Sequence, residues 1–297
     1  MNRFDMLFIG QMGVSRIFPF EGSPFIEEGS PLLFAAAAAS SLGKRIAAVT
    51  RITADKEYLL EPLKNARVDL FVQPGDLYEY EVLFPTQNVD QRKILRMQVG
   101  KPFMIGDLPP VEPCLIHLCC IGVRGFHLDL ARALKARGFR LSVDMQIFMR
   151  QADPVTGLGD SRLEDFPEKR EIVSIADFVK LDAVEGRMLT GLDAPEDQAE
   201  TLEGWGSRET IITCSAGVFA RSEGKTGFAE FTNRSGPGRM GRGDTVMGSY
   251  LARRLNHSVQ DALRFAAALT SIKLESQGPF RGTLKDVVRR MGHAPLE

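Results

Sequence analysis

The stretch GRGDTVMGSYLARRL, residues 241–255, decides how the chain is interpreted, because glycines at 238, 241 and 243 lead into a helical pattern of apolar residues. Glycine-rich backbone at a helix N-terminus directs several N–H groups to one point, and the helix dipole favours an anion there. Asp244 lies at the N-cap or in the first turn, where its carboxylate could accept a proton beside a bound phosphate. Aspartate is also an ordinary N-cap, so this stretch alone leaves both interpretations open.

Outward from this stretch, short apolar segments alternate with helical patterns, as in parallel βαβ construction. Strands are predicted at 6–10, 45–50, 68–72, 114–120, 140–144, 177–181 and 210–214, and helices at 31–43, 58–66, 126–138 and from near Thr245 and Ser258. The fold class is therefore α/β, a three-layer, doubly wound, mostly parallel sheet. We expect one domain over residues 1–297.

One region breaks the alternation. The segments LYEYEVLF (77–84) and QRKILRMQV (91–99) alternate polar and apolar residues around the turn PTQNVD, which predicts a β-hairpin. With the Pro- and Gly-punctuated segment near the N-terminus, the hairpin predicts a small β lid formed by about 15–30 and 74–101. Lids on open α/β sheets cover ligands bound at the carboxyl ends of the strands.

The composition narrows the possible functions. The 297 residues carry a formal net charge of −1, which disfavours a nucleic-acid binder, since phosphate affinity needs clustered Lys and Arg. No apolar run reaches the roughly 18 residues that span a bilayer, and the start has no cleavage-site pattern. The four cysteines lack metal-ligand spacing. We therefore expect a cytoplasmic protein that contacts neither membrane nor nucleic acid, in which the literal RGD at 242–244 is not an adhesion motif.

Three segments of the sequence resemble motifs of one enzyme family. GRGDTVMGSYLARRL resembles the carboxy-terminal signature of the ribokinase-like, or PfkB-type, carbohydrate kinase family. ADFVKLDAVEGRMLTG resembles the family's Asn-x-x-Glu segment, here Asp182 to Glu185, and RLSVDMQIFMR resembles its Asp-x-Gln-x-x-x-Arg segment, here Asp144 to Arg150. The motifs follow the family's order over most of the chain, and the GRGD variant is similar to an inositol-kinase-like branch.

The resemblance implies a catalytic role for the glycine-rich stretch. Asp244 would deprotonate the acceptor hydroxyl, and the amides of Gly241, Arg242 and Gly243 would form the hole for the transferred phosphoryl group. Arg242 stands where Ala is commonest. Its guanidinium could strengthen phosphate binding, or it could pair with Asp244 and lower the basicity of that carboxylate.

The resemblance also implies ATP and Mg²⁺ as cofactors. Asp182 and Glu185 would organise hydrated Mg²⁺, an ion that takes few direct protein ligands. The alternative for Glu185 is an ordinary exposed residue in a helix's first turn. Thr213, Ser215 and Gly217 match the family's Thr-x-Gly-x-x-Gly nucleotide loop, although Ser215 replaces the first glycine and the loop is a residue shorter.

The acceptor half departs further from the family. The predicted substrate-binding residues are Gln11, Ser15, Gly29, Gln146 and Arg150. Ser15 stands where relatives place an Asp that holds two sugar hydroxyls, and a neutral hydroxyl cannot supply the same charge-assisted hydrogen bonds. Arg150 could clamp a phosphate or form a solvent-facing salt bridge.

We expect from these features a kinase that transfers the γ-phosphoryl of Mg·ATP to a sugar, cyclitol or related small polyol. A nucleoside kinase on the same scaffold is the enzymatic alternative. A catalytically weak nucleotide or sugar sensor is the alternative from another class, motivated by Ser15. Lids in the family pair between subunits, which implies a homodimer through the β lid.

Overall fold

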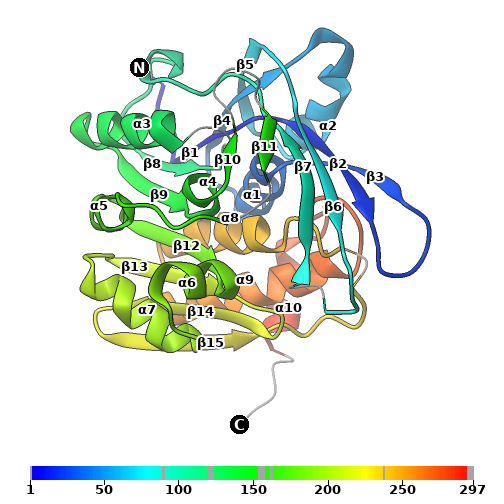
Figure 1. Cartoon of the computed structure of the whole chain (residues 1–297). Coiled ribbons are helices and arrows are strands. Elements are labelled where there is room, and N and C mark those ends of the chain that lie inside the picture. The colour runs from blue at the N-terminus through cyan, green and yellow to red at the C-terminus, as the bar shows by residue number, and fades with distance from the viewer. Residues whose placement is uncertain are drawn as a thin grey trace.

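The computed structural model describes residues 2–88, 91–119, 124–152, 158–160, 163–236 and 238–292. In these residues nine strands form one sheet, in the order β15-β14-β13-β12-β9-β8-β1-β4-β5 (Figure 1). The pairs from β5 to β13 are parallel, and β14 and β15 add an antiparallel edge. The strands are β1 (Met6–Ile9), β4 (Ile46–Ile52), β5 (Asp69–Pro74), β8 (Leu115–Leu118), β9 (Arg140–Asp144), β12 (Phe178–Asp182), β13 (Glu209–Thr213), β14 (Gly217–Ser222) and β15 (Lys225–Glu230). The predicted α/β class is confirmed.

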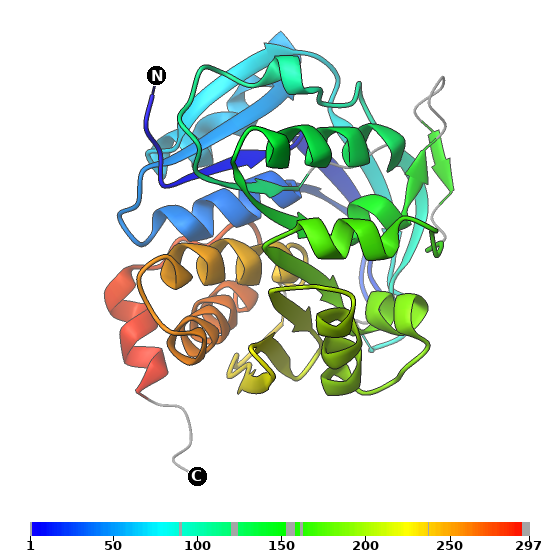
Figure 2. The same ribbon diagram turned by 90° about the vertical axis from the view of Figure 1, so that its left-hand side faces the viewer.

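Helices cover both faces of this sheet. One layer contains α1 (Pro31–Ser40), α2 (Glu61–Asn65), α8 (Arg242–Arg254), α9 (Val259–Leu274) and α10 (Leu284–Met291). Within it, α1 packs against α8, α8 against α9, and α9 against α10 (Figure 2). The other layer contains α3 (Arg124–Ala136), α5 (Lys169–Ile175), α6 (Ala183–Thr190) and α7 (Pro195–Gly204). The predicted helix at 58–66 is α-helical over α2, and its first residues belong to a 3₁₀ helix, η1 (Ala54–Leu60). Two further short helices are η3 (Ile105–Asp107) and α4 (Gln146–Met149).

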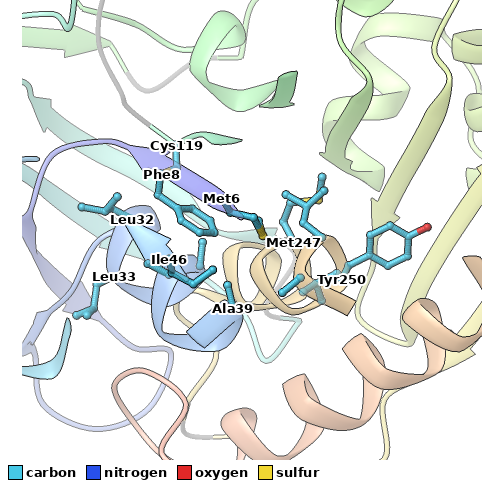
Figure 3. Close-up of a cluster of buried hydrophobic side chains, with 14 of the residues drawn as sticks. Met6, Phe8, Leu32, Leu33, Ala39, Ile46, Cys119, Met247 and Tyr250 are labelled. Atoms are coloured by element: carbon cyan, nitrogen blue, oxygen red, sulfur yellow. The ribbon is translucent and has the colours of Figure 1, made fainter. Parts of the chain in front are cut away.

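The two cores follow from the alternation of side chains along each strand. Met6 and Phe8 of β1 face the layer of α1 and α8 (Figure 3), whereas Leu7 and Ile9 face the layer of α3. All four side chains are fully buried. A strand that is buried on both faces is typical of a parallel sheet between two helical layers.

Helix α1 packs unusually close to α8. Its N-cap Ser30 accepts a hydrogen bond from the Leu33 amide at 3.1 Å, and Pro31 occupies the first helical position. The alanine run that follows lets the backbones approach, since a Cβ added at Gly248 would lie 2.0 Å from the Ala35 carbonyl oxygen. This contact fixes the position of the N-terminus of α8, where the candidate site lies.

A second, smaller sheet stands beside the main one, with the strand order β10-β11-β7-β6-β2-β3 (Figure 1). Its strands are β2 (Gly13–Phe18), β3 (Phe25–Glu28), β6 (Tyr78–Leu83), β7 (Lys93–Gln98), β10 (Gln151–Ala152) and β11 (Leu158–Asp160). The predicted β6–β7 hairpin is confirmed, with a register shift between Glu81 and Val82. The sequence did not indicate β10 and β11, which are too short to give a periodic signal.

The described residues also include no helix that is long and apolar enough to cross a membrane. Of the four cysteines, Cys119 is buried, and Cys114 and Cys214 are partly buried. Cys120 lies outside the described residues.

Candidate active site

The candidate site forms where three strands of the main sheet end. Asp144, Asp182 and Thr213 are the last residues of β9, β12 and β13, and parallel strands bring these carboxyl ends to one edge. The N-terminus of α8 lies at the same edge, so Asp244 joins residues that are far away in sequence.

The glycine-rich turn has a conformation that only glycine adopts easily. Gly241 is the N-cap of α8, with a φ of 73°, and a Cβ there would lie 2.2 Å from the Phe34 ring. Asp244 is the third residue of the helix, and the cap makes no side-chain hydrogen bond. Asp244 therefore lies in the first turn of the helix and not at the N-cap, so its N-cap interpretation is wrong. The Arg242 amide donates to the Arg239 carbonyl at 3.4 Å, and anion binding by this turn stays a prediction.

Asp244 is a partly buried carboxylate among several charges. Burial raises its pKa, the Asp144 carboxylate raises it further, and Lys180 and Arg92 oppose this shift. Its Oδ1 atom is buried without a hydrogen-bond partner among the described residues. A carboxylate with a raised pKa and an unused lone pair has the properties of a general base.

Arg242 is buried in the first turn of α8, with 3% of its surface exposed. Its guanidinium carbon lies 5.9 Å from the centroid of the Phe231 ring. Both predicted roles of Arg242, a contribution to phosphate binding and a pair with Asp244, stay predictions.

Lys180 is a charged residue that the sequence analysis missed. It lies inside β12, and its Nζ donates to Asp144 Oδ2 at 2.7 Å in a pair that is almost completely buried. The Gln146 side chain donates to the same oxygen at 3.1 Å. A Cβ at Gly243 would lie 2.8 Å from the Lys180 ammonium. The sequence feature that could have identified Lys180 is its position within the apolar strand DFVKL, because a buried charge there needs a partner.

Asp182 and Glu185 cap α6 reciprocally. The Glu185 amide donates to Asp182 Oδ1 at 2.9 Å, and the Asp182 amide donates to Glu185 Oε2 at 2.8 Å. Glu185 is completely buried, so its interpretation as an exposed first-turn residue is wrong. Burial and then the Asp182 charge raise the pKa of Glu185 to about 7. Burial also opposes ionisation of Asp182, but Arg92 and Lys180 outweigh it and lower its pKa.

These two carboxylates fit a hydrated divalent cation. Glu185 Oε1 is buried and has no hydrogen-bond partner among the described residues. The described part of the chain contains no group of three or more His, Cys, Asp or Glu side chains placed to hold a metal. Mg²⁺ needs no such group, because it commonly keeps most of its waters and takes one or two carboxylates.

Two cavities meet at Asp244. The small-sheet cavity is lined by Ser15, Glu27, Gly29, Pro31, Phe34, Tyr78, Tyr80, Val82, Arg92, Ile94, Gln146, Met240, Gly241 and Asp244. The loop cavity is lined by Arg92, Gln146, Lys180, Asp182, Thr213, Arg239, Gly241, Arg242, Gly243 and Asp244. The first contains the predicted acceptor side, and the second contains the glycine-rich turn and four basic side chains.

Arg92 connects the two cavities, and the sequence analysis also missed it. It follows the β6–β7 turn, and its Nη2 lies 3.8 Å from Asp182 Oδ2. Arg150 is buried nearby instead of facing solvent, and burial followed by the Arg92 charge lowers its pKa. The polar sequence of the β6–β7 turn did not indicate that Arg92 would lie next to the end of β12.

The predicted acceptor residues are only partly brought together. Ser15, Gly29 and Gln146 line the small-sheet cavity, and the Gly29 carbonyl accepts a 3.4 Å hydrogen bond from the Tyr78 hydroxyl. Gln11 is buried just after β1, and its contact with a substrate stays a prediction.

The predicted nucleotide loop is a tight hairpin between β13 and β14. The Cys214 amide donates to the Gly217 carbonyl at 3.0 Å, and Ser215 is exposed at the tip. A Cβ at Gly217 would lie 2.3 Å from the Ala229 carbonyl oxygen of β15, which gives this glycine a packing role. Thr213 is the residue of this group that lines the loop cavity.

No protein-family model matches this sequence, and a search of curated proteins gives no match. Solved structures do match. A sulfate complex of a pyrophosphate-dependent kinase in the ribokinase family is 25% identical, with a TM-score of 0.84 over 96% of this chain and 99% of that one. A complex of such a kinase with a pyrophosphate analog and myo-inositol is 24% identical, with a TM-score of 0.82 and the same coverage. Arabidopsis thaliana ribokinase with ribose and ATP is 16% identical, with a TM-score of 0.75 over 99% and 100% of the two chains.

The chain therefore has the ribokinase-like fold, as its motifs predicted. The similar structures are named as pyrophosphate-dependent kinases in the ribokinase family and as a ribokinase, and a carbohydrate kinase is the class of enzyme that the motifs predicted.

Proposed function

We propose that the protein transfers a phosphoryl group from a phosphate donor to a hydroxyl of a sugar, cyclitol or related small polyol. One observation carries this proposal: Asp244 and the Gly241 turn line both cavities, so a base and an anion hole stand between an acceptor site and a donor site. This is the arrangement that in-line phosphoryl transfer requires.

In the proposed reaction Asp244 accepts the proton of the acceptor hydroxyl. The hydroxyl oxygen forms a bond to the terminal phosphorus of the donor, and the bond from that phosphorus to the bridging oxygen breaks. The amides of Gly241, Arg242 and Gly243 stabilise the charge on the transferred group. Arg92, from the small sheet, neutralises charge between donor and acceptor. Closure of the small sheet as a lid excludes water.

Mg²⁺ is the metal that we propose for this site, held by Asp182 and Glu185 mainly through water. When bound, it would neutralise charge on the donor phosphates. Lys180 pairs with the neighbouring Asp144 and lies against the turn at Gly243.

ATP is the proposed donor, and inorganic pyrophosphate is a second candidate. Pyrophosphate is favoured by the four basic side chains around the loop cavity, which are Arg92, Lys180, Arg239 and Arg242. In the Thr213–Gly217 hairpin the Cys214 amide is already bonded to the Gly217 carbonyl and is not available to a nucleotide. Three of the similar structures are named as pyrophosphate-dependent kinases.

A matrix of donors and acceptors tests the function. Purified protein with Mg²⁺ is given ATP or pyrophosphate together with ribose, fructose, myo-inositol or adenosine, and phosphorylated product is measured by mass spectrometry. We expect turnover with a neutral polyol and one of the two donors. Preferred turnover of adenosine would establish the nucleoside kinase instead. Saturable binding without any product would establish the sensor.

The protein is also proposed to form a homodimer through the small sheet. Ile26 and Leu95 are 59% and 52% exposed on its strands, and a partner would cover them. Sedimentation velocity at micromolar concentration should give a dimer that Ile26→Asp with Leu95→Asp converts to a monomer. A monomeric native protein would contradict the proposal.

A further inference from the structure

The small-sheet cavity contains a carboxylate that the motifs did not indicate. Strands β2 and β3 pair antiparallel, and their register places Ser15 directly opposite Glu27. Residues that are opposite one another in such a pair project from the same face. Ser15 is 2% exposed and Glu27 is 7% exposed, and both line the cavity that contains Asp244. The strand register thus places the Glu27 carboxylate beside the Ser15 hydroxyl in this cavity.

Glu27 is poorly satisfied by the protein itself. Among the described residues, one hydrogen bond to its carboxylate is present, a long one of 3.4 Å from the Gly278 amide to Oε1. Burial raises the pKa of Glu27, and Lys273 and the Gly278 amide only partly oppose this. Buried carboxylates normally have several donors. The remaining lone pairs of the Glu27 carboxylate can therefore accept hydrogen bonds from a ligand.

The cation near Glu27 is engaged elsewhere. The Lys273 ammonium donates hydrogen bonds to the carbonyl oxygens of Gly238 and Met240, in the segment that leads to the Gly241 turn. It also lies 4.8 Å from the centroid of the Phe34 ring. Lys273 thus opposes the raised pKa of Glu27, while its printed hydrogen bonds go to the segment that precedes the Gly241 turn.

We propose that Glu27 binds hydroxyl groups of the acceptor and thereby restricts the substrate to neutral polyols with adjacent hydroxyls. The inference rests on the proposed kinase function. A carboxylate accepts two neighbouring O–H groups in charge-assisted hydrogen bonds. Glu27 and Asp244 line the same cavity, so their charges repel an acceptor that already carries a phosphate. Glu27 is a specificity-determining residue in this scheme, and Asp244 is the base.

The test compares Glu27→Gln with Glu28→Gln as a matched control. Glu28 is the next residue of β3, exposed on the opposite side of the strand. With the best acceptor among myo-inositol, ribose and fructose, Glu27→Gln should raise the acceptor KM by roughly 10- to 100-fold, the range for a hydrogen bond to a charged group. The donor KM and the Tm should stay close to wild type. Glu28→Gln should leave all of these values unchanged.

A second measurement separates recognition from a structural effect. Monodeoxy derivatives of the same acceptor are assayed with wild type and Glu27→Gln. For the derivative that lacks the bound hydroxyl, the variant should lose almost nothing further, because the two changes remove the same hydrogen bond. Equal losses for every derivative, or an acceptor KM within twofold of wild type, would overturn the role of Glu27. Preferred phosphorylation of a sugar phosphate would overturn it as well.

Failure of the kinase proposal can be told apart from failure of this inference. If wild type transfers no phosphoryl group, calorimetric binding of myo-inositol, ribose and fructose to the protein is compared between wild type and Glu27→Gln. Binding that weakens by roughly 10-fold or more in the variant sustains the recognition role. Binding unaffected by the variant, or no binding of any neutral polyol to wild type, overturns it.

Discussion

Replacement of Asp244 by Asn should lower kcat by about 10²- to 10⁴-fold, the usual contribution of a positioned general base. The amide has nearly the shape of the carboxylate but cannot take the proton of the hydroxyl. Donor binding, measured by calorimetry, should stay close to wild type, because the backbone amides of the turn are unchanged. In wild type, kcat/KM should fall as the pH is lowered, with an apparent pKa above the ordinary aspartate value of 3.8, since burial raises the pKa of Asp244.

The matched control for this prediction is Asp197→Asn. Asp197 is also the third residue of its helix, α7, but it is exposed and does not line either cavity. It should keep wild-type kcat and the same pH profile. Wild-type turnover by Asp244→Asn would refute the proposed mechanism, whatever the donor is.

Replacement of Lys180 by Met should lower the free energy of unfolding by about 3–5 kcal/mol, the usual cost of breaking a buried ion pair. The Asp144 carboxylate, 1% exposed, would lose the ammonium group that lies 2.7 Å away. Phosphoryl transfer should fall as well. Lys180 opposes the raised pKa of Asp244, so without Lys180 a smaller fraction of Asp244 is ionised and able to accept the proton. Urea denaturation followed by circular dichroism measures the change in stability.

Lys64→Met is the control for that prediction. Lys64 pairs with Glu61 at the same distance of 2.7 Å, but the two side chains are 49% and 56% exposed. Solvent screens such a pair, so the denaturation midpoint should not change. Equal effects of the two substitutions would show that burial does not set the strength of the Lys180 pair.

Much of the fold could be predicted because its signals are local. Strands such as RLSVD end where the structure ends them, at Asp144, and Ser258 caps α9 as its position before a helical pattern indicated. The hairpin at 77–99 was readable from its alternation. The 3₁₀ segment Ala54–Leu60 was not, since a helical pattern does not distinguish it from an α-helix.

The candidate site was predicted in part for the same reason. Asp244, Gly241 and Asp182 lie in motifs whose members are adjacent in sequence, so spacing was enough to place them at a helix start or a strand end. The Asp244 cap interpretation failed because Gly241 takes the N-cap position in a left-handed conformation. Sequence spacing does not determine the φ angle.

The sequence by itself determined the alternating α/β pattern and the glycine-rich turn before α8, because each is set by residues within a few positions of one another. Only the tertiary structure decided what surrounds them. Strand register places Glu27 opposite Ser15, and the small sheet brings Arg92 to within 3.8 Å of Asp182. Helix packing brings Lys273 onto the carbonyls that precede Gly241. These contacts join distant segments, and their geometry depends on how the sheets and helices pack.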